Sequence, residues 1–61
     1  MSRKGHSAAQ LAARWNVSEA TATEWLQDFA AGGFAVSNRG YWYATRKAFK
    51  AFVWHEGKKA A

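Results

Sequence analysis

The stretch Gln10–Leu26 reads QLAARWNVSEATATEWL and predicts two short helices joined by a tight turn at Asn16-Val17-Ser18. Spacings of three and four residues place apolar side chains on one face of each helix. These side chains are Leu11, Ala12 and Trp15 in the first helix and Ala22, Trp25, Leu26 and Phe29 in the second. We therefore expect the two helices to pack against each other through these faces.

The side chains expected to point away from this shared core are small or polar. They are Ser18, Glu19, Thr21, Thr23 and Glu24. An apolar face shared by two helices, with a polar outer face on the second, is typical of a helix-turn-helix. In that motif the second helix is usually offered to the major groove of DNA.

Local signals set the ends of the first helix. Ser7 is a good N-cap, and Gln10 stands where a capping-box partner is expected. The helix is predicted over 8–15, where four alanines favour it. Asn16 can adopt the left-handed conformation that ends a helix, and Val17 is expected to fill the core between the helices.

The second helix is predicted over 19–31, with Ser18 as its N-cap. Glu19 lies in its first turn, where the positive end of the helix dipole favours an acid. Gly32-Gly33 is expected to stop it, because glycine is common just beyond a helix.

A β-hairpin is predicted over 34–44, with a turn at residues 37–40. The loop length stays open. A loop of two or four residues would put Tyr41 and Tyr43 on the face of Phe34 and Val36, whereas a loop of three would put Trp42 there.

A third helix is predicted over 46–56, with Thr45 as its N-cap and Gly57 as its stop. Its apolar stripe consists of Ala48, Phe49, Phe52 and Val53. Trp54 falls near the opposite face with Lys47 and Lys50. We expect Phe49, Phe52, Val53 and Trp54 to pack on the first two helices or to form a homodimer contact through this helix. For Trp54, stacking on nucleic acid beside Lys47 and Lys50 is a further alternative.

Composition supports a single small domain, because the chain has 61 residues and no cysteine. Stability must therefore come from a compact core, for which four Trp, four Phe and two Tyr supply volume. The aromatic residues expected in the core are Trp15, Trp25, Phe29, Phe34, Phe49 and Phe52.

Nine Lys/Arg against four Asp/Glu give a net charge of +5, which favours a polyanionic partner. Some of these charges lie in the flanks of the predicted domain 7–56. Residues 1–6 form an expected flexible basic arm, and residues 57–61 an expected basic tail.

The order helix, helix, hairpin, helix resembles the winged helix-turn-helix family over Ser7–Thr45. The positions that match it are Leu11-Ala12, Val17-Ser18, Ala22, Trp25-Leu26, Phe29, Gly32-Gly33-Phe34 and Arg39-Gly40-Tyr41, with Asn16 where the family often has glycine. The resemblance implies a mainly helical fold in which helix 19–31 enters the major groove and the hairpin 34–44 is the wing.

Two features depart from the family. Winged helices usually have another helix, and often a strand, before the helix-turn-helix, whereas six residues precede it here. The presumed recognition helix contains Glu19, Glu24 and Asp28 and no Lys or Arg. A carboxylate can still sit in the major groove if it accepts from cytosine N4.

The expected role is therefore sequence-specific binding of double-stranded DNA, in transcription control or as a recombination or replication accessory factor, in a phage or bacterial setting. The expected base contacts are Ser18, Glu19, Thr21, Thr23, Glu24 and Gln27. The expected contacts to the DNA backbone are Arg3, Lys4, Arg14, Asn38, Arg39, Lys47 and Lys50.

Other classes fit the sequence less well. It shows no catalytic triad, no phosphate-cradling glycine loop and no set of metal ligands, so we expect no enzyme activity, cofactor, metal or small-molecule substrate. No apolar run is long enough for a membrane span, and a cytoplasmic location is expected. The alternatives are a protein-interaction module that uses the acidic helix and the aromatic third helix, and RNA binding through the hairpin aromatics.

Overall fold

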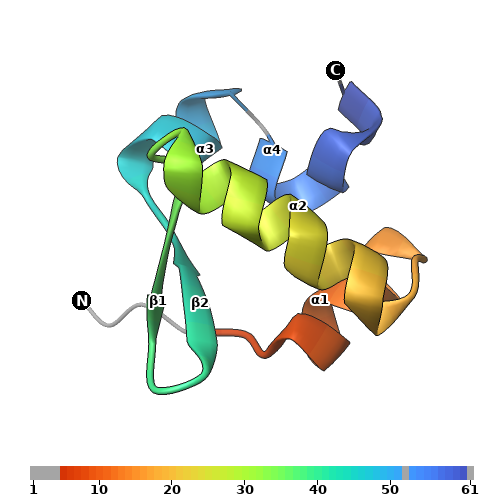
Figure 1. The fold of residues 1–61 in the computed structure, drawn as a ribbon. Coiled ribbons are helices and arrows are strands. Elements are labelled where there is room, and N and C mark those ends of the chain that lie inside the picture. Colours follow the sequence, from red (N-terminus) through yellow and green to blue (C-terminus); the bar gives the residue numbers. More distant parts are fainter. Residues whose placement is uncertain (1–4, 52, 61) are drawn as a thin grey trace.

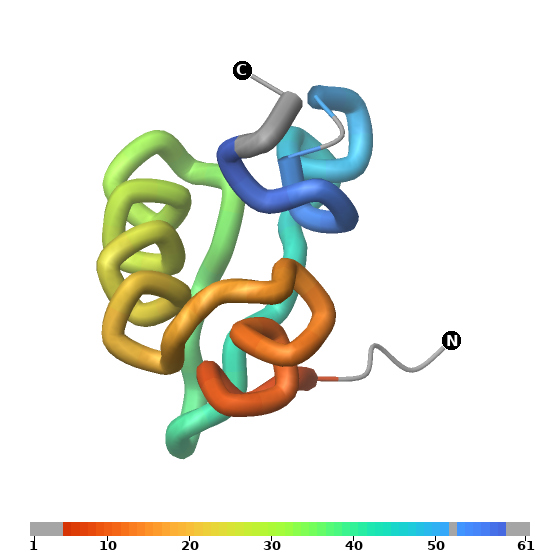
Figure 2. Tube along the Cα trace, turned by 90° about the vertical axis from the view of Figure 1, so that its right-hand side faces the viewer, coloured from red at the N-terminus to blue at the C-terminus, as the bar shows by residue number. Residues whose placement is uncertain are grey.

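The computed structural model describes residues 5–51 and 53–60. It has the expected layout of helix, helix, hairpin and helical C-terminal part (Figure 1). The elements are α1 (Ala8–Trp15), α2 (Glu19–Ala31), β1 (Ala35–Asn38), β2 (Tyr41–Ala44), α3 (Arg46–Ala51), α4 (Val53–Glu56) and a short 3-10 helix, η1 (Gly57–Ala60). In Figure 2, α2 lies on one side of the molecule, and α1, α3 and α4 lie toward the other.

The predicted caps of α1 and α2 are confirmed. The Ser7 hydroxyl accepts from the Gln10 N–H at 3.2 Å, and the Gln10 side chain accepts from the Ser7 N–H at 3.0 Å, which completes a capping box. Asn16 ends α1 in the left-handed conformation with φ 59°. The Ser18 hydroxyl caps α2 by accepting from the Thr21 N–H at 3.1 Å.

The predicted faces of α1 and α2 form the centre of the core. The fully buried side chains of these helices are Leu11, Ala12, Trp15, Ala22, Leu26 and Phe29. Trp25 is partly buried against them. The Trp15 indole N–H donates to the carbonyl oxygen of Trp54 at 2.9 Å, which joins α1 to α4.

The hairpin has a two-residue loop, Arg39-Gly40, with φ 55° and 84°. Positive φ at both positions is the type I′ turn, whose twist suits paired strands. Tyr43 then pairs with Val36, as expected for this loop length, but that face of the hairpin is the outer one. Trp42 lies on the inner face and packs on the core. The open question of register is thus settled with Trp42 inward.

A single bridge extends the hairpin on the far edge of β2. His6 and Trp42 exchange backbone hydrogen bonds of 3.0 and 2.8 Å. Gly5 lies so close to β2 that a Cβ atom there would be 2.7 Å from Cζ of Tyr43. The end of the expected arm at 1–6 is therefore docked on the sheet, while Arg3 and Lys4 lie outside the described residues.

The expected single helix 46–56 is instead described as α3 and α4, and its predicted stripe is partly wrong. Phe49 was expected in the core but is 50% exposed, whereas Trp54, expected off the stripe, is only 5% exposed. On one straight helix, Ala48 and Trp54 would be about 120° apart around the axis, so a narrow apolar stripe would not contain both. Val53 is partly buried as expected, and Phe52 lies outside the described residues.

The C-terminal elements close over the two tryptophans at the end of α1 and in α2. Gly57 follows α4 as predicted, with φ +61°, and a Cβ atom there would lie 2.7 Å from Cζ3 of Trp25 and 3.2 Å from Cγ of Trp15. Glycine is thus required by conformation and by space at the point where η1 crosses these rings.

This close approach predicts that Gly57→Ala destabilises the fold more than Gly40→Ala. Both glycines have positive φ, so each substitution costs about 1–2 kcal/mol of backbone strain. Only Gly57→Ala adds a clash, worth about 1–3 kcal/mol more, because nothing lies within 4 Å of a Cβ at Gly40. Urea unfolding of both variants measures the difference, and equal losses would contradict the packing of η1 on Trp25.

Candidate nucleic-acid interface

The outer face of α2 is the surface that the sequence assigned to DNA bases, and it is open. Glu19, Glu24 and Gln27 are exposed there, whereas Thr21 and Thr23 are half-buried at its sides. Since α2 packs on the core through its opposite face, this outer surface is presented along most of the length of the helix (Figure 1).

The hydroxyl groups expected to read bases take part in the structure of α2 itself. The Ser18 hydroxyl donates to Oγ1 of Thr21 at 2.9 Å while it caps the helix. The Thr23 hydroxyl donates to the carbonyl oxygen of Glu19 at 2.9 Å. Among the described residues, the side chains of Glu19, Glu24 and Gln27 make no hydrogen bond, so they are the polar groups on this face free to contact a partner.

Two lysines gather at the C-terminal end of α2. The Lys47 ammonium donates to the carbonyl oxygen of Gly32 at 3.0 Å and lies 5.1 Å from the centre of the Phe34 ring. Lys58 forms an ion pair with Asp28. Cations are favoured at this end because the helix dipole is negative there. Lys47, expected on the DNA backbone, thus has a role within the fold.

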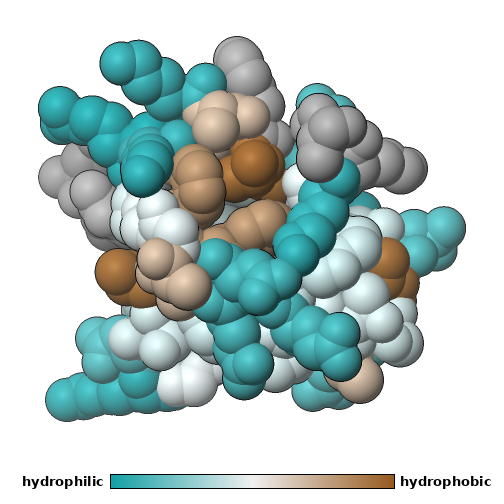
Figure 3. Space-filling view, turned by 45° about the horizontal axis from the view of Figure 1, so that its top comes forward, coloured by the Kyte–Doolittle hydropathy of each residue, from teal (hydrophilic) through white to brown (hydrophobic). Residues whose placement is uncertain are grey.

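The face at the top of Figure 1 carries apolar side chains in its centre and hydrophilic ones around them (Figure 3). Phe34 and Val53 are partly buried against the core. The Lys47 stem over Phe34 covers part of this apolar surface.

The wing residues Asn38 and Arg39 are exposed at the tip of the hairpin. This tip is at the end of the hairpin away from α3, so Arg39 stands apart from Arg46, Lys47 and Lys50 (Figure 1). The basic residues that were expected together on the DNA backbone therefore lie on different parts of the surface.

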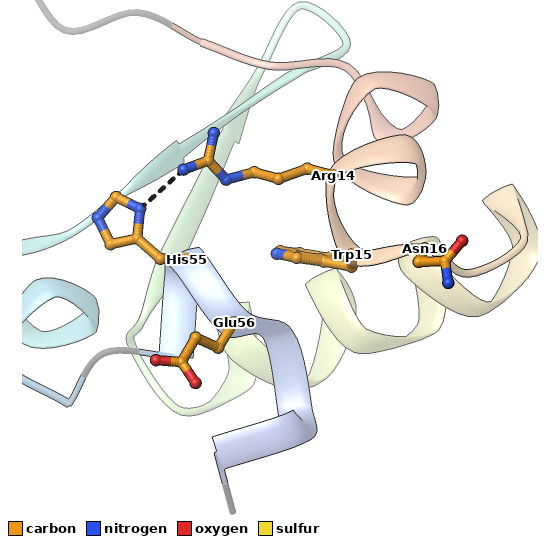
Figure 4. Close-up of a pocket in the computed structure, with 5 residues that line it drawn as sticks. All are labelled: Arg14, Trp15, Asn16, His55 and Glu56. Atoms are coloured by element: carbon orange, nitrogen blue, oxygen red, sulfur yellow. Dashed lines mark hydrogen bonds between the residues drawn. The ribbon is translucent and has the colours of Figure 1, made fainter.

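Arg14 does not share the outer face of α2. Its Nη2 lies 3.2 Å from Nδ1 of His55 in α4, and the two side chains point toward each other (Figure 4). They border an open cavity of about 240 Å³ that is lined by Arg14, Trp15, Asn16, His55 and Glu56. Small-molecule sites usually have about 300–1,000 Å³, so this cavity is below that range.

No sequence pattern indicates this contact. Arg14 and His55 are 41 residues apart, and neither stands in a motif with the other. Only the return of α4 onto α1 brings them together. The residues grouped as a dimer or packing contact are also divided, because Trp54 and Val53 pack in the core of this chain and Phe49 stays exposed.

Other kinds of site find no structural basis within the described residues. There, no three His, Asp or Glu side chains gather in a way that could hold a metal ion. No described helix is long and apolar enough to cross a membrane. Comparison of the chain with protein-family models, curated proteins and solved structures gives no match.

Ser18 caps α2 and is also an expected base contact, so a substitution there would not test base recognition alone. We expect Ser18→Ala to lower the free energy of unfolding by about 1 kcal/mol, because the N–H of Thr21 loses its acceptor. Ser18→Gly should cost only a few tenths, since glycine is tolerated at this position. Thermal or urea unfolding compares the two variants; an unchanged stability in Ser18→Ala would show that the cap is not formed in solution.

Proposed function

We propose that this chain binds double-stranded DNA, with the outer face of α2 in the major groove and the β1–β2 hairpin as a wing. One observation carries the proposal: α2 packs on α1 through a single face and leaves the opposite face open, and the hairpin follows directly from its end. This is the arrangement by which helix-turn-helix proteins present a recognition helix.

Two further observations favour the resemblance to winged helices. The single bridge between His6 and Trp42 lies before α1, where winged helices often have a strand. Trp54 of α4 packs on Trp15, and in this proposal the C-terminal helical part would take the place in the core of the missing helix before α1. These contacts bear only on the elements missing before the helix-turn-helix, and the acidic recognition helix remains a departure from the family.

Attraction and selection are divided between different residues in this proposal. The side-chain charges at the N-terminal and central part of α2 are Glu19 and Glu24, which repel phosphates. Arg39 at the wing tip would contact the backbone, with Arg3 and Lys4 as further candidates. Glu24 would accept from cytosine N4, and Gln27 suits adenine, so α2 would contribute sequence choice. The role would be that of a small cytoplasmic transcription regulator or a recombination or replication factor.

Arg39→Asn tests the wing contact. Asparagine tolerates positive φ, so the turn is kept while the charge is removed. We expect a weaker affinity for every duplex sequence and a salt slope, log Kd against log salt concentration, that falls by about 0.9. Fluorescence anisotropy with a labelled random duplex at several salt concentrations measures both. A duplex affinity that does not fall with salt, in the unaltered chain, would exclude the proposal.

Glu24→Gln tests the recognition helix. Loss of the carboxylate removes a repulsion, so we expect tighter binding to random duplex together with weaker preference among selected sequences. Glu56→Gln is the matched control, because it removes the same charge from α4, on the other side of the molecule. If both variants change duplex binding equally, α2 is not the surface that meets DNA.

A protein-interaction module is the second candidate, favoured by the acidic outer face of α2. In that case Glu24 would meet a basic partner, and the chain would show no salt-sensitive retention of duplex DNA. The anisotropy measurement above separates the two candidates.

A further inference from the structure

A row of cationic and ring side chains runs across the side of the molecule that α1, α3 and α4 form. Arg14 Nη2 lies 3.2 Å from His55 Nδ1, and the His55 ring lies 5.6 Å from the ring of Phe49 at 45°. Arg46 precedes Phe49 by three residues on α3, so the two are neighbours on its surface. We call these four side chains the Phe49 surface.

The Phe49 surface is open to solvent and lies away from the outer face of α2. Arg14, Arg46, Phe49 and His55 are all exposed, and Phe49 leaves half of its ring uncovered. In Figure 2, α2 forms one side of the molecule, whereas α1, α3 and α4 lie toward the other. A ligand on the Phe49 surface could therefore bind without displacing one from α2.

Alternation of cations with an exposed ring is the pattern by which proteins bind single strands. Aromatic rings stack on unpaired bases without regard to sequence, while cations between them hold phosphates. Phe49 beside His55 offers such a ring, with Arg14 in contact with His55 and Arg46 three residues before Phe49 on α3. A paired duplex could not use Phe49, because its bases are already stacked.

The cavity beside His55 adds groups suited to a base edge. Arg14 supplies donors and Glu56 supplies acceptors, and Asn16 supplies both. The carboxylate of Glu56 disfavours a phosphate inside the cavity, so phosphates are expected at the outward ends of the two arginines. Figure 4 shows Arg14 and His55 meeting at this cavity.

We propose that the Phe49 surface binds single-stranded DNA, with one base stacked on Phe49 and the phosphates on either side held by Arg14 and Arg46. The choice of DNA over RNA rests on the proposed function, since a protein held on a duplex meets single-stranded DNA where that duplex opens. The stacking geometry itself is independent of what α2 binds.

A second copy of this chain fits the Phe49 surface less well. The acidic face of α2 has the opposite sign, but its centre consists of Ala20, Glu24, Gln27 and Ala31. None of these side chains offers a ring or a large apolar group to cover Phe49. A second copy held by charge alone would therefore leave the Phe49 ring exposed, whereas a stacked base would cover it.

The test is binding of labelled dT12 to the full chain by fluorescence anisotropy. Phe49→Ala should weaken binding about fivefold or more, the effect of losing one stacked base. Tyr41→Ala is the matched control, because Tyr41 is exposed to the same degree but lies on the hairpin, and it should leave dT12 affinity unchanged. Arg14→Ala should lower the salt slope by about 0.7.

Other outcomes would overturn the proposal. One is that the chain does not bind dT12, or binds rU12 in place of dT12. Another is that Phe49→Ala and Tyr41→Ala lose the same amount of dT12 affinity. A third is that sedimentation shows a homodimer that Phe49→Ala dissociates. Arg39→Asn and Phe49→Ala separate the two sites. If Arg39→Asn weakens duplex binding and leaves dT12 binding intact, the change concerns the proposed duplex site and not the Phe49 surface. Far-UV circular dichroism of each variant checks that the fold is kept.

Discussion

The packing of Trp15 is the contact on which the rest of the structure depends. Its ring centre lies 5.8 Å from those of Trp25 and Phe29 in α2 and 6.2 Å from that of Trp54 in α4. Its indole N–H is satisfied by the Trp54 carbonyl, where an unpaired buried donor would cost about 1–3 kcal/mol. One side chain thus joins α1, α2 and α4 in a chain close to the lower size limit for folding alone.

This arrangement leaves the molecule with two chemically different sides. Because Ala22, Leu26 and Phe29 meet Trp15 and its neighbours, the polar and acidic residues of α2 face solvent. The return of α4 to Trp15 places His55 beside Arg14 on the other side. The acidic outer face of α2 and the cluster of Arg14, His55 and Phe49 are therefore separate consequences of one core.

Local signals predicted most of the fold. Caps at Ser7 and Ser18 and the left-handed Asn16 depend on neighbours within three residues, so the sequence reveals them. Phe49 was wrongly assigned to the core and Trp54 was wrongly placed off the apolar stripe, because a helical wheel assumes one continuous helix. The inner face of the hairpin was not predictable for a similar reason: it depends on which strand face meets the core.

The candidate site was predictable only in part. The outer face of α2 follows from the same periodicity that gives its core face, so its residues were found from sequence. The meeting of Arg14 with His55, and of His55 with Phe49, depends on the tertiary path of α4 and has no local signature. The separation of this cluster from the acidic outer face of α2 is visible only once that path is known.

The most direct test of this separation is a titration of the isotope-labelled chain with duplex DNA, followed by amide chemical shifts. The account predicts shifts at Ala20, Thr23, Glu24 and Gln27 on α2 and at Arg39 and Gly40 in the wing, with Phe49 and His55 unmoved. Shifts confined to Phe49, His55 and Arg14, with α2 unmoved, would contradict it.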